Sequence, residues 1–360
     1  MRARSLARSL AAAARFALRA RARAAPSVRS LARSLAAAAR FALRARVRAR
    51  AAPSTLIAPA RLRLSPSADG SGSTEADERS QLEAIDALVG HCAPAPAFID
   101  TAWIYYTNGL HSEEIVGKAV AKHGRAAFVI ATKFGNLRFG AGPPCSSTAV
   151  IHEQYAESVA RLGCAPDLYY QHRPDLTRDV AEVMVDLKEM HGRGLFKYAG
   201  LSECTSAELR RAHAVFPVSC VQMEYSLAER GIEASLLPTC KELGVGVVAY
   251  SPLARGLLTG TVKSAESLDK GDRRLPHPRW SGEAMASNVA RFATLGDVAA
   301  KKGCTPSQLC LAWLLAKWDM VVPIPGSKTA ARVLENMGAI DVKLSPEEVA
   351  ALEAMGAWRA

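Results

Sequence analysis

The strongest constraint on the fold is an alternation of short apolar runs with longer segments of helical periodicity, which continues through most of the chain. The runs are rich in Val, Ile and aromatic residues, and each has the length of one buried β-strand. Seven strands are predicted, beginning near residues 97, 127, 167, 196, 218, 245 and 320. Helices are expected near residues 75–90, 112–123, 149–162, 178–193, 206–214, 232–243, 285–317 and 329–337. Repeated strand–helix units of this kind build a parallel sheet covered by helices.

Two parallel architectures fit this alternation, a closed barrel and an open doubly wound sheet. An open sheet that binds nucleotides usually carries a glycine-rich phosphate loop after one of its strands. No GxGxxG motif follows any predicted strand, and no GxxxxGK[ST] motif occurs anywhere in the chain. The predicted fold is therefore the α/β class of closed (β/α)8 TIM barrel.

Four polar residues stand where three successive predicted strands end, and they are Asp100, Tyr105, Lys133 and His172. The strand C-termini of a (β/α)8 barrel all open on one face, so these side chains are expected to share a pocket. An ammonium beside a tyrosine favours the phenolate and lowers the pKa of the phenol. A carboxylate can hold the lysine, and a histidine can orient a carbonyl oxygen. The set suits carbonyl reduction with Tyr105 as the proton donor.

The same residues, in the same order, resemble the aldo-keto reductase superfamily. That family has an Asp, Tyr, Lys and His tetrad in which the tyrosine follows the aspartate by five positions, as in DTAWIY here. The resemblance covers roughly residues 96–355 and includes HSEEIVGKAV, ATKFGN, DLYYQHRPD, VQMEYS, AYSPLARGLLTG and VPIPGSK with RVLEN. The HRPD and AYSPLARG motifs are most similar to those of the branch of auxin-induced and pyridoxal-type reductases. The resemblance implies a barrel that uses NADPH/NADP+ to convert an aldehyde or ketone to an alcohol.

The resemblance also implies how a nicotinamide cofactor is held without a Rossmann motif. In the family, the residues matching Ser202 and Gln222 bond the carboxamide, and the residue matching Tyr250 stacks on the nicotinamide ring. The SPLARG turn, residues 251–256, would meet the pyrophosphate through backbone amides and side chains. The predicted contributors from this turn are Ser251, Leu253 and Arg255.

Residues after the last predicted strand are expected to bind the adenosine end of the cofactor. They lie in IPGSK and RVLEN and are Ser327, Lys328, Arg332, Glu335 and Asn336. By resemblance, Arg332 and Ser327 would clasp the 2′-phosphate, which favours NADPH over NADH, since a guanidinium meets a phosphate bidentately. The alternative is that Arg332 and Glu335 form an ordinary ion pair on an exposed helix, at i and i+3.

Several stretches depart from the family pattern. The predicted first strand, APARLRLS at residues 58–65, has no glycine, and Arg61 and Arg63 would be costly inside a barrel. Tyr106 stands where the family usually has glycine, and Glu203 stands where many members have asparagine. Two alternatives to an active reductase follow: a cofactor-binding regulatory subunit of the channel β-subunit type, and an inactive barrel with a damaged first strand. The retained tetrad favours turnover.

Residues 1–54 form a low-complexity leader in which SLARSLAAAARFALRAR occurs twice, at residues 5–21 and 30–46. Each copy is amphipathic on a helix, rich in Arg and free of acidic residues, a pattern typical of organelle transit peptides. The leader is expected to engage the import machinery of a mitochondrion or plastid, and the barrel is expected to occupy residues 55–360. The alternative is low-complexity translated sequence ahead of a cytoplasmic protein.

The formal charge of +12 is concentrated in this leader, since residues 1–63 contain 16 Arg and no acidic residue. The remainder has 30 basic and 34 acidic side chains and no dense basic stripe, so a nucleic-acid partner is not expected. The eight cysteines form no CxxC pair, which predicts no metal site and indicates thiols of a reducing compartment. No apolar run reaches the length of a membrane span, so a soluble protein is expected. The tetrad and the family resemblance imply a small-molecule carbonyl substrate as the partner.

Overall fold

The structure is a computed structural model that describes residues 74–107, 110–137, 142–268, 272 and 274–358. The predicted leader and the predicted first strand at residues 58–65 lie outside the described residues. No described helix is both long and apolar enough to cross a membrane. All eight cysteines are free thiols.

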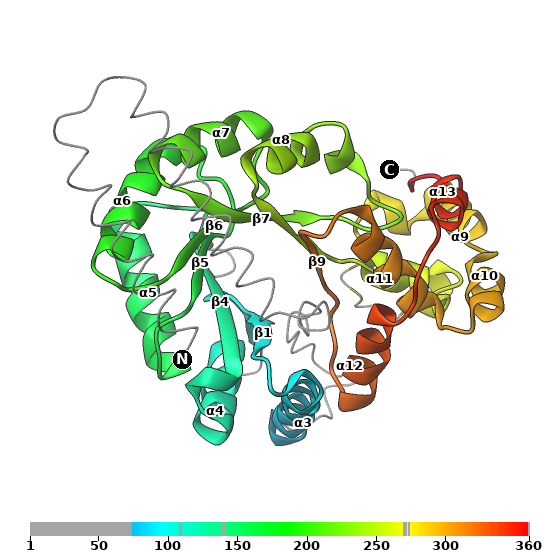
Figure 1. Ribbon diagram of the computed structural model, residues 1–360, viewed down its shortest axis with the longest axis horizontal. Helices are drawn as coiled ribbons and strands as arrows, with labels where there is room; N and C mark the ends of the chain where they lie inside the picture. Colours follow the sequence, from blue (N-terminus) through cyan, green and yellow to red (C-terminus); the bar gives the residue numbers. More distant parts are fainter. Residues whose placement is uncertain (1–73, 108–109, 138–141, 269–271, 273, 359–360) are drawn as a thin grey trace, which may run out of the picture. The chain divides into compact units, whose positions relative to one another are not determined.

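Seven parallel strands form one sheet, and their spatial order follows their order in the sequence. They are β1 (Ala97–Asp100), β4 (Phe128–Phe134), β5 (Leu168–Gln171), β6 (Tyr198–Ser202), β7 (Val218–Glu224), β8 (Gly246–Tyr250) and β9 (Val321–Ile324). Figure 1 shows the strands curving around a common centre with the helices outside them. A doubly wound sheet would reverse its strand order at a switch point, and this sheet does not. The predicted barrel class is confirmed, and all seven predicted strands are present.

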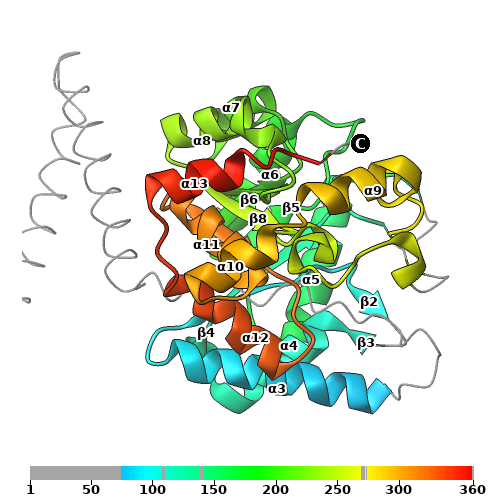
Figure 2. The same ribbon diagram turned by 90° about the vertical axis from the view of Figure 1, so that its right-hand side faces the viewer.

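Eleven α-helices lie within the described residues, and most follow a strand as predicted. They are α3 (Thr74–Cys92), α4 (Ser112–His123), α5 (Thr148–Leu162), α6 (Val180–Gly192), α7 (Ser206–Val215), α8 (Leu236–Leu243), α9 (Gly282–Arg291), α10 (Leu295–Lys302), α11 (Pro306–Lys317), α12 (Ala330–Met337) and α13 (Pro346–Glu353). The sequence did not predict α13. A short antiparallel hairpin, β2 (Tyr106–Thr107) with β3 (Leu110–His111), follows β1 and lies right of centre in Figure 2.

The single helical span predicted for residues 285–317 was wrong, because the chain forms three helices there. Gly303 ends α10 in the left-handed conformation, with φ at 71°. Thr305 then begins α11 with a capping box, and Pro306 occupies the first turn of that helix. These local stop and start signals outweigh an apolar periodicity that continues across them.

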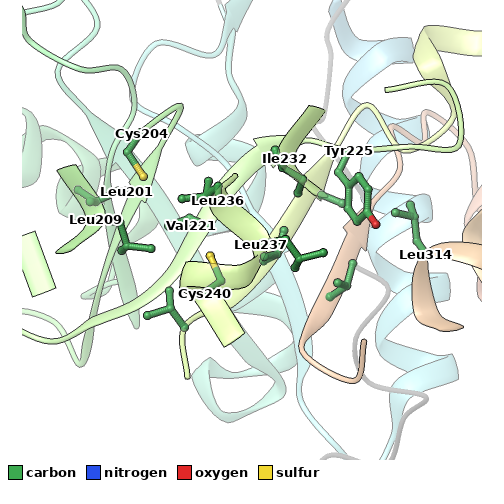
Figure 3. Close-up of a cluster of buried hydrophobic side chains, with 14 of the residues drawn as sticks. Leu201, Cys204, Leu209, Val221, Tyr225, Ile232, Leu236, Leu237, Cys240 and Leu314 are labelled. Carbon is green, nitrogen blue, oxygen red and sulfur yellow. The ribbon is translucent and has the colours of Figure 1, made fainter. Parts of the chain in front are cut away.

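The strands separate two apolar layers. Inside the barrel, a small cluster gathers residues from β4, β5, β7, β8 and β9, including Leu168, Tyr170 and Ile324. Outside it, a larger cluster fills the space between strands and helices, and Figure 3 shows its part between β6 and β7 and the helices α7 and α8. Tyr169 belongs to the outer cluster and Tyr170 to the inner one, because successive strand residues point to opposite faces.

Asp167, directly before β5, joins three segments at the amino-terminal side of the sheet. Its carboxylate accepts hydrogen bonds from Arg125 Nη2 at 2.5 Å, Lys197 Nζ at 2.6 Å and the backbone N–H of Ile130 at 2.9 Å. Burial raises the pKa of Asp167, but the bonds from Lys197, Ile130 and Arg125 outweigh burial, and the net pKa is lowered. A carboxyl group whose pKa is lowered by folding stabilises the protein above its ordinary pKa.

We expect Asp167→Asn to lower the free energy of unfolding by about 1–3 kcal/mol at pH 7, because two cationic side chains lose their anionic partner. The difference from wild type should be complete above about pH 4 and should shrink as the pH falls through the lowered folded pKa. Urea unfolding at several pH values measures it. Glu242→Gln, which alters the exposed pair with Arg210, is the control and should leave stability nearly unchanged. A stability difference for Asp167→Asn that stayed constant down to pH 3 would contradict this account.

Candidate active site at the carboxyl ends of the strands

The predicted site residues lie at the carboxyl ends of the parallel strands. Asp100 is the last residue of β1, Lys133 is the last but one of β4, and His172 directly follows β5. The backbone N–H of His172 continues the ladder by donating to Phe134 O at 2.8 Å. Because the strands are parallel and in sequential order, these ends meet on one face of the barrel.

Asp100 and Lys133 form an ion pair whose side chains are both fully buried. Lys133 Nζ donates to Asp100 Oδ1 and also to the carbonyl oxygen of Thr101, at 2.7 Å. Gln222 Nε2 donates to the other carboxylate oxygen, Asp100 Oδ2, at 2.8 Å. A buried ion pair is tolerated only when its remaining donors and acceptors are also satisfied. Here the Thr101 carbonyl and the Gln222 amide supply such further bonds to the lysine and to the carboxylate.

Tyr105 lies against this ion pair. Lys133 Nζ is 5.2 Å from the centroid of the Tyr105 ring, a distance at which a cation and an aromatic ring attract. The His172 ring meets the Tyr105 ring edge to face, with centroids 5.6 Å apart and an angle of 82° between the planes. The four residues that the sequence singled out are therefore brought into one cluster.

The loop that carries Tyr105 is anchored by hydrogen bonds to neighbouring segments. The backbone N–H of Trp103 donates to Lys133 O at 3.1 Å, and that of Ser112 donates to Tyr105 O at 2.9 Å. Arg161 on α5 reaches the carbonyl oxygen of Trp103 at 3.3 Å and binds Glu113 at 3.0 Å. These hydrogen bonds hold the backbone of the Tyr105 loop against β4, α4 and α5.

Glu113 is the central acceptor of that support. It is fully buried and accepts a hydrogen bond from Thr132 Oγ1 at 2.6 Å, in addition to the one from Arg161. Burial raises the pKa of Glu113, and the hydrogen bonds from Thr132 and Arg161 only partly oppose it. At the start of α4, a carboxylate could simply complement the helix dipole. Its contacts show that it also links α4 to β4 and α5.

Three residues were predicted to face a nicotinamide: Ser202 and Tyr250 are the last residues of β6 and β8, and Gln222 is two residues before the end of β7. Ser202 Oγ donates to Gln222 O at 2.9 Å. Tyr250 is buried, and its pKa is raised by that burial and then by the nearby Glu203 and Glu224 carboxylates. Ser202 is thus linked to Gln222, and Gln222 to Asp100, while Tyr250 lies on the neighbouring strand opposite Glu224.

Arg173 is a site residue that the sequence did not single out, although it lies within the HRPD motif. Its Nη1 atom donates to His172 O at 2.9 Å and to Ser202 Oγ at 3.3 Å. The guanidinium also lies 5.9 Å from the centroid of the Tyr250 ring. Arg173 stands two residues past a predicted strand end, but a lone arginine in a loop is usually a solvated charge, and nothing local in the sequence marks this one as different.

The SPLARG turn has an unusual backbone. Ser251, Ala254 and Arg255 adopt φ values of 48°, 47° and 54°, which non-glycine residues rarely adopt, and Gly256 follows at 101°. The carbonyl oxygen of Arg255 accepts from Arg274 Nη1 at 2.9 Å. Leu253 packs against the core, and the Arg255 side chain is 3.9 Å from Glu224. Two N–H groups of the turn bond within it, that of Ala254 to Ser251 O at 2.8 Å and that of Gly256 to Leu253 O at 3.0 Å.

The residues after β9 form a second group at the start of α12. Ser327 is buried and accepts from Asn336 Nδ2 at 3.0 Å, and the carbonyl oxygen of Lys328 accepts from Ser80 on α3 at 2.8 Å. Arg332 pairs with Glu335 at 3.0 Å, so the predicted alternative of an exposed ion pair is present. The Arg332 side chain is still 46% exposed, which leaves part of its guanidinium open to solvent.

Comparison with known protein families assigns most of the chain to one of them. A family model described as the aldo/keto reductase family matches residues 67–357. The chain belongs to the aldo/keto reductase family. The match begins after residues 58–65, so the atypical predicted first strand is not part of it.

Solved structures of family members superimpose on this aldo/keto reductase family chain. A glycerol dehydrogenase from Gluconobacter oxydans is 26% identical with a TM-score of 0.69, over 79% of this chain and 86% of that one. An aldo-keto reductase from Klebsiella pneumoniae in complex with NADPH is 27% identical with a TM-score of 0.59, over 78% and 86% of the two chains. A structure from the same organism in complex with NADP and acetate is 26% identical with a TM-score of 0.59, over 79% and 88%.

We expect Lys133→Met to lower the free energy of unfolding by about 3–5 kcal/mol, because Asp100 is left buried without its cation. The double variant Asp100→Asn/Lys133→Met should recover part of that loss, since neither side chain then carries a buried charge. Urea unfolding of the two single variants and the double variant measures the coupling. Purely additive losses would mean that the two charges do not depend on each other.

Proposed function

We propose that this protein is an NADPH-dependent oxidoreductase that reduces an aldehyde or ketone to an alcohol, with Tyr105 as the general acid. The observation that carries the proposal is the placement of Tyr105 beside the buried Asp100–Lys133 pair, with His172 against the edge of its ring. An alcohol dehydrogenase or carbonyl reductase is the corresponding enzyme class. Family membership over residues 67–357 supports the proposal.

The strand ends and the turns beyond them fit a nicotinamide dinucleotide. Ser202 offers a hydroxyl group, Gln222 offers an amide group beside Asp100, and the buried Tyr250 ring offers an aromatic surface. The Ser251 hydroxyl and the Arg255 guanidinium of the SPLARG turn offer donors to a pyrophosphate. Complexes of Klebsiella pneumoniae relatives with NADPH and with NADP support the same cofactor for this chain. When bound, NADPH supplies the hydride for the reduction.

The adenosine end of the cofactor is assigned to the group at the start of α12. Arg332, with Ser327 nearby in sequence, would bind the 2′-phosphate, and Lys328, Glu335 and Asn336 would complete this end of the site. Binding would require the Arg332 guanidinium to exchange its exposed pair with Glu335 for a phosphate, and such exposed pairs contribute little to stability. A charged phosphate is the stronger partner.

The protein's own residues account for the proton transfer. Tyr105 donates its phenolic proton to the carbonyl oxygen as negative charge develops there. The Lys133 ammonium stabilises the phenolate that remains, and Asp100 holds that ammonium in place. His172, next to the Tyr105 ring, orients the carbonyl oxygen by hydrogen bonding. Because the ion pair is buried, its field acts in a poorly hydrated environment and is screened less than it would be in water.

A regulatory subunit that binds a cofactor without turnover would not need this arrangement. Asp100, Lys133 and Tyr105 are in contact, and the supporting loop is anchored by Arg161 and Glu113. No described contact favours the inactive alternative, which concerns residues 58–65 outside the described region. We therefore retain the reductase as the proposed function.

We expect Tyr105→Phe to lower kcat for carbonyl reduction by about 100-fold or more while the Kd for NADPH stays nearly unchanged, because only the proton donor is lost. NADPH oxidation across a panel of aldehydes and ketones, with fluorescence titration of the cofactor, measures both. Tyr106→Phe is the matched control: this neighbouring tyrosine is 53% exposed, and its loss should leave kcat nearly unchanged. The opposite pattern would assign the acid to Tyr106.

We expect Arg332→Ala to raise the KM for NADPH by roughly tenfold or more and to leave the KM for NADH nearly unchanged, because only NADPH carries the 2′-phosphate. Steady-state kinetics with both cofactors provides the test. Arg210→Ala, which removes a comparably exposed arginine paired with Glu242, is the control and should change neither value. An equal rise in both KM values would remove the 2′-phosphate contact from Arg332.

A further inference from the structure

We propose that Tyr170, a residue of the barrel interior outside the predicted tetrad, positions the Lys133 ammonium beside Tyr105. This inference rests on the proposed function, because it concerns the group that stabilises the Tyr105 phenolate. In the sequence Tyr170 looks like an ordinary aromatic strand residue. The register between β4 and β5 places it directly opposite Lys133.

Lys133 and Tyr170 are direct neighbours across the parallel pair of β4 and β5. Lys133 Nζ lies 5.7 Å from the centroid of the Tyr170 ring and 5.2 Å from that of the Tyr105 ring. Both the Lys133 and Tyr170 side chains are fully buried. The attraction between an ammonium and an aromatic ring is strongest where water is excluded, so two rings act on this one charge.

The position of the Tyr170 ring is itself determined by the next two strands. Tyr170 pairs with Gly200 on β6, and Gly200 pairs with Cys220 on β7. A Cβ atom at Gly200 would lie 2.3 Å from Cδ1 and 2.4 Å from Cε1 of Tyr170, closer than side chains pack. The ring therefore occupies the space that a side chain at Gly200 would need. Its hydroxyl lies 3.1 Å from Cys220 Sγ, at the far side of β6.

Tyr170 does not compete with Tyr105 as a proton donor. Burial, followed by the proximity of Cys220 and Asp100, raises the pKa of Tyr170 well above its ordinary value. The phenol remains neutral and its hydroxyl points toward Cys220. What it offers Lys133 is the ring. Without that ring, Asp100 and the Thr101 carbonyl would still bind the ammonium, but one side of it would face a cavity.

The first test compares two substitutions of Tyr170. Tyr170→Leu removes the ring, and kcat should fall roughly tenfold or more while the KM for NADPH changes little, because small displacements of a reacting group lower kcat steeply. Tyr170→Phe keeps the ring and loses only the hydroxyl, so it should retain most of the wild-type kcat. A Phe variant as impaired as the Leu variant would overturn the assignment to the ring.

Tyr169→Leu is the matched control for lost packing. Tyr169 is equally buried on the same strand, but it lies in the outer cluster and donates to Ile151 O at 3.0 Å. Its replacement should lower Tm about as much as Tyr170→Leu does and should leave kcat nearly unchanged. Equal losses of kcat in the two leucine variants would show a general packing effect and would overturn the proposal.

Gly200→Ala tests the same contact from the neighbouring strand. Its added methyl group needs the space of the Tyr170 ring, so the single variant should displace the ring and reproduce the kcat loss of Tyr170→Leu. In the Tyr170→Leu background part of that space is vacated, and Gly200→Ala should cause no further loss of kcat. Losses that multiply in the double variant would mean that the two residues act separately.

A readout independent of turnover is the NMR signal of the Lys133 ε-methylene group, in protein labelled with ¹³C at that position in lysine. Nearby aromatic rings shift this signal, which Lys133→Met identifies by its loss. Tyr170→Leu should move it and Tyr170→Phe should not. An unmoved signal in Tyr170→Leu would overturn the positioning role. If wild type reduced no carbonyl compound while the signal still responded, the proposed function would fail and the contact between Tyr170 and Lys133 would stand.

Discussion

The buried ion pair between Asp100 and Lys133 is the interaction on which the rest of the site depends. Two charges removed from water are costly, and close pairing with further hydrogen bonds to both groups is needed to offset the cost. Here Lys133 also binds the Thr101 carbonyl, and Asp100 also accepts from Gln222. Strands β1, β4 and β7 must therefore hold their relative register, or a buried charge loses its partner. The same requirement keeps the ammonium next to Tyr105.

Parallel register transmits this requirement around the barrel. One row of neighbours runs from Lys133 through Tyr170 and Gly200 to Cys220, across four adjacent strands. A second set of hydrogen bonds comes from the helix layer, where Arg161 connects the Tyr105 loop to Glu113, and Glu113 accepts from Thr132 on β4. The barrel interior and the helix layer thus both hold the site, through contacts between residues distant in sequence. Catalytic geometry in the proposed reductase is a property of the assembled sheet.

Much of the fold was predictable, because the sequence signals of strands and helices lie within the segments that form them. The seven strands of the parallel sheet and the bounds of α4 follow from apolar periodicity and capping residues. The span of residues 285–317 was mispredicted since periodicity alone ignores Gly303 and the capping box at Thr305. The placement of the tetrad follows from strand ends, whereas Arg173 was missed because nothing local distinguishes it from a solvated arginine. The leader as a transit peptide and the first strand at residues 58–65 stay predictions.

The sequence by itself determined the strand–helix order, the family, and the chemistry of the side chains that the strand ends carry. Those properties depend on residues close together in the chain, so the spacing and composition of single segments are enough to predict them. Only the tertiary structure decided that Gln222 donates to the Asp100 carboxylate. It also decided that Arg173 donates to both His172 O and Ser202 Oγ. The Tyr170 ring likewise lies where a side chain at residue 200 would otherwise be. The reason is physical: such neighbours are set by interstrand register and by the shape of the packed interior, and neither is encoded in any one segment.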